Sequence, residues 1–132
     1  MKVKKQKGIA QLKKIADKIV SEYVRRKDAD FNGYNSCFTC GVKKHYKELQ
    51  CGHYISRIYG HTRYYLPNLR PQCPACNIFK HGNMDEYALR LERETPGILE
   101  ELNRWKKMPP TPFNWIELNK LIEDYKQKVK AL

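Results

Sequence analysis

Two Cys-x-x-Cys pairs constrain this chain more than any other feature: Cys37 with Cys40, and Cys73 with Cys76. Four thiolates in two such pairs can surround one zinc ion tetrahedrally, which is the closed geometry of a structural zinc site. Gly41 follows the first pair, where the backbone has to turn tightly around the metal. Pro74, inside the second pair, suits the first turn of a helix because its missing N–H costs nothing there. We therefore expect a structural Zn²⁺ that joins a turn to the start of a helix.

Length and cysteine content set the outer limits of the fold. A chain of 132 residues forms about one domain, and its polar central part, 34–82, offers little apolar packing. Structural zinc, worth on the order of 10 kcal/mol, is expected to replace that packing. Five cysteines without an apolar stretch long enough for a signal peptide or a membrane span favour a reducing cytoplasm, with thiolate–metal chemistry rather than disulfides. The fifth, Cys51, is interpreted as a free thiol, with contact to a second metal site as the alternative.

The charge balance predicts a polyanionic partner. The chain has 26 Lys and Arg against 14 Asp and Glu, a formal net charge of +12, which attracts nucleic acid and speeds its encounter. Between residues 34 and 82, Glu48 is the only acid. The helices lack the segregation of basic and apolar faces that a membrane-surface helix needs, so DNA is the expected partner and a membrane is not. Four basic residues of this segment are the candidate DNA contacts: Arg57, Arg63, Arg70 and Lys80.

Hydrophobic spacing predicts the first elements. In 8–27 apolar residues recur every three or four positions, which indicates an amphipathic helix. Its lysine-rich lead, 1–7, is either a solvated tail or a DNA contact. The segment 48–56 favours a β-strand, 63–66 is a second candidate strand, and 74–80 is expected to form a short helix.

The last third is expected to be helical. Asn83 and Glu86 form a capping-box pattern, and Thr95-Pro96 predicts the start of a further helix. After Thr111-Pro112 a final helix carries a short heptad-like seam, 115–129. This seam should pack against the first helix or against a second copy of the chain.

Four polar residues around the second cysteine pair stand in an order that indicates nuclease chemistry: His53, Asn68, Asn77 and His81. On a helix, Asn77 and His81 at i and i+4 would share one face and could point at one ion. This order and separation resemble those of the HNH, or ββα-metal, endonucleases. More narrowly, the segments 49–57, 67–77 and 80–83 resemble the phage NinG, or Rap, recombination endonucleases, and similar flanking helices extend the likeness over nearly the whole chain.

The resemblance implies a fold class. We expect an α+β, mainly helical, single domain over 1–132. A zinc-bound, treble-clef-like ββα-metal (HNH) core, 34–82, would be flanked by an N-terminal helical part, 1–33, and by C-terminal helices, 83–132.

The resemblance also implies roles for individual side chains. His53 would be the general base, since an imidazole titrates near cellular pH. Asn68 would hold the hairpin that orients this imidazole. Asn77 and His81 would bind a catalytic Mg²⁺ or Mn²⁺. Arg57 is the candidate phosphate clamp, because a guanidinium offers phosphate two hydrogen bonds.

Gly52 departs from the family pattern. Many HNH enzymes carry a metal ligand immediately before the general base, and Gly52 has no side chain to offer. Gln50, Cys51 or the backbone could contribute instead, with water and DNA phosphate completing the shell. Alternatively, His53 binds the metal and another group acts as base. The absence of carboxylates from this set predicts weak metal binding without DNA.

The resemblance implies a metal-dependent, structure-specific DNA endonuclease that hydrolyses phosphodiester bonds in branched recombination intermediates, such as Holliday junctions or D-loops. It also implies that the protein acts in the cytoplasm of the bacterial host of a phage. A zinc-stabilised DNA-binding module without catalysis and a sequence-specific HNH nicking endonuclease are the alternatives. Because junction cutting calls for one active site per strand, a homodimer is expected.

Overall fold

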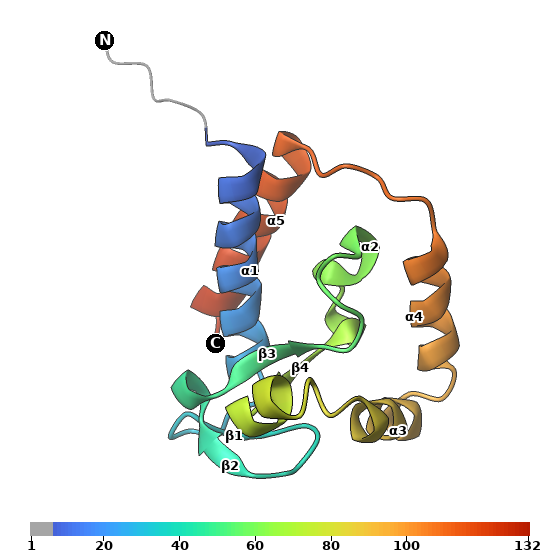
Figure 1. Cartoon of the computed structure of the whole chain (residues 1–132). Helices are drawn as coiled ribbons and strands as arrows, with labels where there is room; N and C mark the ends of the chain where they lie inside the picture. Colours follow the sequence, from blue (N-terminus) through green and yellow to red (C-terminus); the bar gives the residue numbers. More distant parts are fainter. Residues whose placement is uncertain (1–6) are drawn as a thin grey trace.

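Two long helices near the ends of the chain pack side by side in the computed structural model, which describes residues 7–132 (Figure 1). Helix α1 spans Ile9–Arg26 and helix α5 spans Trp115–Lys130. Residues four apart share one face of a helix, and the α1 side chains at this spacing are buried: Leu12, Ala16, Val20 and Val24. They pack with the α5 side chains Leu118, Ile122 and Tyr125 and with Leu69 of the central segment. The predicted first helix is confirmed, and the seam of the last helix packs against it within the chain.

The central segment forms two short antiparallel hairpins. Strand β1 (Tyr34–Ser36) pairs with β2 (Lys43–His45), and the turn between them carries the first cysteine pair. Gly41 adopts φ +80° in this turn, a left-handed conformation that glycine adopts without strain. A 3₁₀ turn, η1 (Tyr46–Glu48), leads into β3 (Gln50–His53), which pairs with β4 (Leu69–Gln72). The strand expected within 48–56 is therefore present.

The prediction of a second strand over 63–66 is wrong. Between β3 and β4 the chain forms a one-turn helix, α2 (Gly60–Arg63), and a 3₁₀ turn, η2 (Leu66–Asn68). The aromatic residues that suggested a strand pack against distant elements instead. Tyr64 packs edge-on against Phe113 with ring centroids 5.5 Å apart, and Tyr65 lies 6.1 Å from Trp105. Tertiary aromatic contacts thus overrode a weak local preference.

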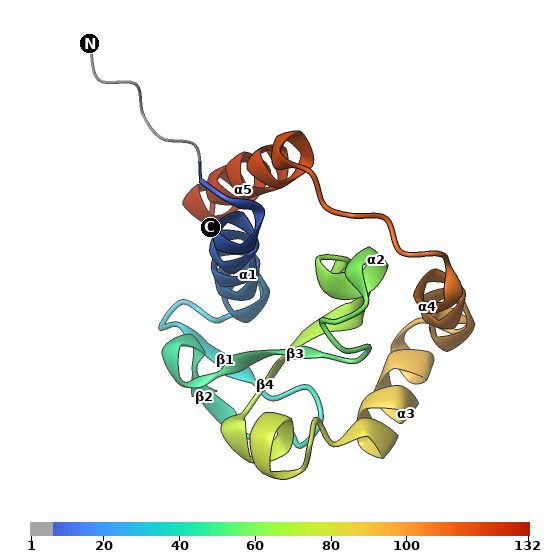
Figure 2. The same cartoon turned by 45° about the horizontal axis from the view of Figure 1, so that its top comes forward.

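Helical elements follow β4. The second cysteine pair begins a π-helical turn, η3 (Ala75–Phe79), with Pro74 at its start as expected. Helices α3 (Met84–Glu94) and α4 (Ile98–Lys107) come next. Their buried side chains form a separate core with Ile55: Tyr87, Leu91, Ile98 and Leu102. A non-helical segment, 108–114, then leads from α4 to α5 (Figure 2).

The predicted helix caps were only partly right. Asn83 precedes α3, but its φ is +49° and its side chain makes no capping hydrogen bond, so the capping box is wrong. The α4 helix begins two residues beyond Thr95-Pro96, at Ile98, with Gly97 before it. The Glu92 carboxylate accepts hydrogen bonds from the backbone N–H groups of Gly97 and Leu99. It thereby does what the side chain of an N-cap residue usually does, since the N-cap here is a glycine. The first residues of α3 and α4 therefore depend on contacts that the local sequence pattern does not predict.

Candidate functional site

The four cysteines of the two pairs converge on one point. Their sulfur atoms all lie within 4.8 Å of one another, with Cys40 Sγ 3.7 Å from Cys73 Sγ. A tetrahedron with Zn–S bonds of about 2.3 Å places its sulfurs about 3.8 Å apart, so the cluster fits a zinc ion. The Thr39 hydroxyl lies 3.4 Å from Cys37 Sγ, and the Asn83 amide donates to Cys76 Sγ at 3.7 Å. The position predicted for a structural metal therefore has the geometry to hold one.

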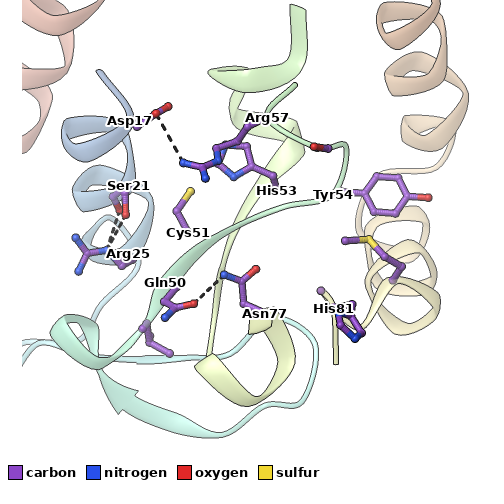
Figure 3. A pocket seen from close by; sticks show the side chains of 14 residues that line it. Asp17, Ser21, Arg25, Gln50, Cys51, His53, Tyr54, Arg57, Asn77 and His81 are labelled. Atoms are coloured by element: carbon purple, nitrogen blue, oxygen red, sulfur yellow. Dashed lines mark hydrogen bonds and ion pairs between the residues drawn. The ribbon is translucent and has the colours of Figure 1, made fainter. Parts of the chain in front are cut away.

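A pocket of about 670 Å³ opens beside this cluster, between α1, β3 and the segment that begins with η3 (Figure 3). Six residues that the sequence singled out line it: Gln50, Cys51, His53, Arg57, Asn77 and His81. Helix α1 supplies three lining residues that the sequence analysis did not identify, namely Asp17, Ser21 and Arg25. Segments far apart in the sequence thus meet around one space.

His53 ends strand β3 and is held by the loop that follows. Its Nε2 lies 3.1 Å from the Arg63 carbonyl oxygen. A carbonyl only accepts, so in the neutral ring Nε2 carries the proton and Nδ1 keeps the lone pair. Burial lowers the pKa of His53, and the neighbouring Arg57 charge lowers it further, while the Arg63 carbonyl and Asp17 oppose this. The pKa of His53 is therefore below its usual value, which favours a neutral imidazole that can take up a proton.

Asn68 does not line the pocket, and its side chain is fully buried. Its Oδ1 accepts from the Ile55 N–H at 2.7 Å, and its Nδ2 donates to the carbonyls of Ile55 at 3.0 Å and Thr62 at 3.1 Å. One side chain therefore ties both ends of the loop between β3 and β4.

Asn77 and His81 line the pocket from different backbone structures. Asn77 lies in η3 and donates from Nδ2 to Gln50 Oε1 at 2.8 Å, which leaves its Oδ1 as the oxygen that could ligate an ion. The helical turn ends at Phe79, and His81 follows it with φ +50°. The expectation that the pair shares one helix face is therefore wrong, and Figure 3 shows the His81 ring to one side of Asn77. Within residues 7–132, the cysteines are the only group of three or more Cys, His, Asp or Glu side chains placed to hold a metal.

Gly52 is explained by its neighbour across the hairpin. A Cβ at this position would overlap the Gln72 Oε1. The Gln72 side chain is fully buried and donates to Thr39 Oγ1 at 3.1 Å and to the Gly82 carbonyl at 2.9 Å. The Gly52 carbonyl in turn accepts from the Tyr87 hydroxyl at 2.8 Å. The missing ligand side chain is thus replaced by a packing contact between the strands.

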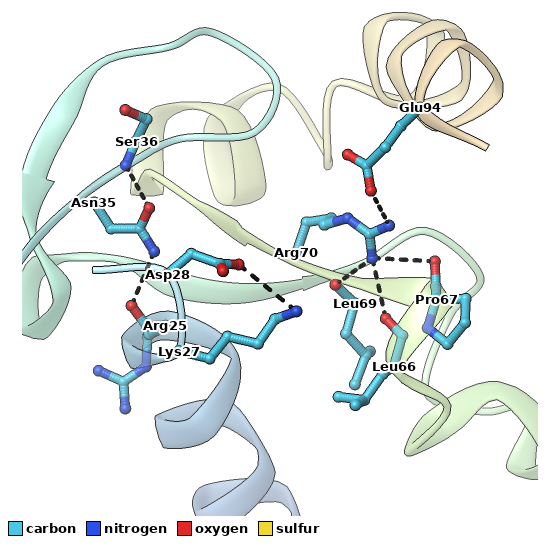
Figure 4. A network of polar contacts seen from close by, with 10 residues as sticks. All are labelled: Arg25, Lys27, Asp28, Asn35, Ser36, Leu66, Pro67, Leu69, Arg70 and Glu94. Carbon is cyan, nitrogen blue, oxygen red and sulfur yellow. Dashed lines mark hydrogen bonds and ion pairs between the residues drawn. The ribbon is translucent and has the colours of Figure 1, made fainter. Parts of the chain in front are cut away.

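The four candidate DNA contacts differ in availability. Arg63 donates twice to the Asp17 carboxylate, at 2.6 and 3.0 Å. Arg70 donates to Glu94 at 2.8 Å and to the carbonyl oxygens of Leu66, in η2, and Leu69, at the start of β4 (Figure 4). Arg57, whose side chain is 61% exposed, lies 3.8 Å from Asp17, and Lys80 is exposed. Arg57 and Lys80 are therefore the better placed to meet a phosphate in this conformation.

Cys51 is the fifth cysteine and stands apart from the cluster. Burial raises the pKa of its thiol to about 12, so it stays protonated at neutral pH and is a poor metal ligand. It lines the pocket between β3 and α1 as a small apolar group. The interpretation as a free thiol agrees with this environment.

One known family matches the chain. The family model described as Bacteriophage Lambda NinG protein matches residues 1–132. No curated protein and no solved structure gave a significant match. In the part of the chain that is described, no helix combines the length and the apolar character needed to cross a bilayer. The chain belongs to the NinG family.

Proposed function

We propose that this member of the phage NinG family is a metal-dependent DNA endonuclease that cleaves branched recombination intermediates, such as Holliday junctions and D-loops. The observation that carries the proposal is the placement of His53: an imidazole with a lowered pKa lines a pocket that is also lined by Asn77, His81 and the exposed Arg57. The net charge of +12 would draw a polyanionic backbone to this pocket.

His53 is assigned the role of general base. Hydrolysis needs a group that removes a proton from the attacking water, and Nδ1 of the Nε2–H tautomer is available for it. The Arg63 carbonyl keeps the ring in this tautomer. Burial keeps the imidazole neutral at cellular pH, as the lowered pKa indicates.

Asn77 and His81 would hold the catalytic Mg²⁺ or Mn²⁺, which supplies Lewis-acid stabilisation of the phosphate and the leaving oxygen. Gln50 is a further possible ligand, since its amide contacts Asn77. Because this ligand set has no carboxylate, we expect weak ion binding by the DNA-free, zinc-loaded protein. Calorimetry that gives tight Mg²⁺ or Mn²⁺ binding without DNA would contradict this ligand set.

Arg57 is proposed as the phosphate clamp. Its guanidinium is largely exposed and lies 3.8 Å from the Asp17 carboxylate, a weak contact that an incoming phosphate can replace with two charge-assisted hydrogen bonds. Arg57→Ala should therefore weaken DNA binding, and this loss should decrease as the salt concentration rises.

The decisive experiment is cleavage of a synthetic four-way junction with Mg²⁺ or Mn²⁺. His53→Ala should lower the cleavage rate by about 10²- to 10⁴-fold while zinc content and junction binding persist. His61→Ala is the matched control, because His61 lies outside the pocket and contacts the Pro109 carbonyl at 2.9 Å. Equal cleavage by the wild type and His53→Ala would refute the assigned base.

A zinc-stabilised DNA-binding module without catalysis is the second candidate. Gly52 favours it, because Gln72 fills the position where related enzymes place a ligand. Junction binding without cleavage by the wild type, with either ion, would support this module. Equal cleavage of linear duplexes at one sequence would instead support a sequence-specific nicking enzyme.

We further propose that the active form is a homodimer, since a four-way junction offers two strands to be cut. The buried seam of α5 packs against α1, so the dimer interface would use another surface. Light scattering of the protein with and without junction DNA tests this, and a monomer in both samples at micromolar concentration would contradict it.

A further inference from the structure

Asp17 lies where no motif would place a functional residue, in the middle of helix α1. It is spaced by four from Ser21, which is spaced by four from Arg25, so the three share one helix face. This face lines the pocket opposite β3, as Figure 3 shows. Among the described residues that line the pocket, Asp17 is the only acid.

The carboxylate of Asp17 holds one arginine in a fixed geometry. Arg63 Nε donates to Oδ1 at 3.0 Å, and Arg63 Nη2 donates to Oδ2 at 2.6 Å. Both side chains are less than one-fifth exposed, at 18% and 19%. A two-pronged, partly desolvated pair of this kind restricts both position and orientation, which a single exposed ion pair does not.

Arg63 in turn connects this pair to the imidazole. It is the last residue of α2, a helix of a single turn, which has no stability of its own. The position of its carbonyl therefore depends on external anchors. Asn68 holds the preceding residue through the Thr62 carbonyl, and α1 holds Arg63 itself through Asp17. The Tyr64 hydroxyl adds a second contact to α1, at the Lys13 carbonyl, 3.1 Å away.

We propose that Asp17 is a positioning residue for His53: by clamping the Arg63 side chain, it fixes the Arg63 carbonyl that keeps His53 in the Nε2–H tautomer, with the lone pair on Nδ1. The catalytic part of this inference rests on the proposed function. The tautomer part does not, because it concerns the DNA-free protein. Helix α1 thereby becomes part of the site rather than a support outside it.

Glu22 provides a matched control on the same helix. It is 38% exposed and lies 4.0 Å from Arg26 in a surface pair, so Glu22→Gln removes the same charge without touching the clamp. Arg63→Lys is the second variant. It keeps the positive charge and the backbone carbonyl but loses the two-pronged donor.

The test measures the ring ¹⁵N shifts of His53 by NMR in the full-length, zinc-loaded protein, above the pH at which His53 titrates. Wild type and Glu22→Gln should give a single Nε2–H tautomer. Asp17→Asn and Arg63→Lys should both give a mixture. A mixed tautomer in the wild type, or an unchanged one in both variants, would overturn the proposal. Should Asp17→Asn not fold, Arg63→Lys decides alone.

Junction cleavage supplies the second readout. Asp17→Asn should lower kcat by about 10- to 100-fold and leave KM for the junction unchanged or lower, because Arg57 loses its competing carboxylate. Glu22→Gln should leave kcat unchanged. An unaltered kcat in Asp17→Asn would contradict the proposal, whereas absence of cleavage by the wild type would refute the proposed endonuclease and leave the tautomer measurement valid.

Discussion

The two sides of the pocket are held together by different physics. On the cysteine side, the buried cluster consists of three cysteines and a single leucine: Cys37, Cys73, Cys76 and Leu49. On the helix side, α1 and α5 bury a continuous stripe of aliphatic side chains. With a zinc ion in the cysteine cluster, the first side would depend on metal–thiolate bonds, whereas the second depends on apolar burial. Strand β3 contacts α1 and pairs with β4, which leads into Cys73, so the position of His53 depends on both sides.

Removal of the metal should have the largest effect on stability, and it tests most directly whether the two sides are stabilised differently. Cys73→Ser, or treatment with a strong chelator, should cost on the order of 10 kcal/mol in the cysteine region, because little apolar surface replaces the lost bonds. Hydrogen exchange should show amide protection lost in the two hairpins and η3 but retained in α1 and α5.

Cys51→Ser is the control for this change, because Cys51 lies outside the cluster and should leave zinc stoichiometry and protection unaltered. If the helices lose protection together with the hairpins, the two regions unfold as one cooperative unit and are not stabilised independently.

Truncation of the α5 seam should have the next largest effect. Leu118 is 1% exposed between α1 and α5, so Leu118→Ala should lower the free energy of unfolding by about 2 to 5 kcal/mol. Ile116, in the same helix, is 72% exposed, and Ile116→Ala should change it by less than about 0.5 kcal/mol. Urea unfolding measures both, and zinc content should stay constant. Equal effects of the two substitutions would show that the seam is not buried in solution.

A methyl group at Gly52 tests the strand that the two regions share. Gly52→Ala should cost about 1 to 3 kcal/mol, because the new Cβ overlaps the Gln72 side chain. In a Gln72→Ala background the same substitution should cost much less. A double-mutant cycle in urea provides the measurement, and strictly additive effects would exclude the overlap as the cause.

The pH dependence of His53 should give the smallest effect on stability. Its folded pKa lies below the unfolded value of about 6.5. Between the two values the unfolded chain binds a proton that the folded chain does not. Stability from this group is therefore fully present above about pH 6.5 and declines as the pH falls toward the folded pKa. His53→Ala should flatten this part of the stability profile in urea titrations, and the acid limb of the cleavage rate should lie below pH 6.5.

Local spacing was enough to predict several elements. The cysteine cluster, the left-handed Gly41, the first and last helices and the strand within 48–56 all follow from residues a few positions apart. Among the helix starts, Asn114 accepts from the Glu117 N–H at 2.8 Å as an N-cap should, whereas Asn83 contacts Cys76 Sγ instead. The same residue type thus serves two purposes, and only its surroundings distinguish them.

The candidate site was predictable in composition but not in arrangement. The sequence singled out His53, Asn77 and His81, and they line one pocket. The sequence predicted that Asn77 and His81 share one helix face, which the end of the π-helical turn at Phe79 and the backbone of His81 rule out. It also predicted that Arg63 contacts DNA, although the Arg63 side chain is paired with Asp17.

The amino-acid sequence by itself determined which side chains could bind zinc and which helix faces would be buried, because both depend on short, regular spacings. Only the tertiary structure decided that Asp17 faces the pocket, that Gln72 occupies the space beside Gly52, and which arginines remain exposed. These contacts join residues that are distant along the chain, and no local periodicity encodes them. Asp17 faces the pocket because α1 packs across β3, whereas Gln72 lies beside Gly52 because β3 pairs with β4.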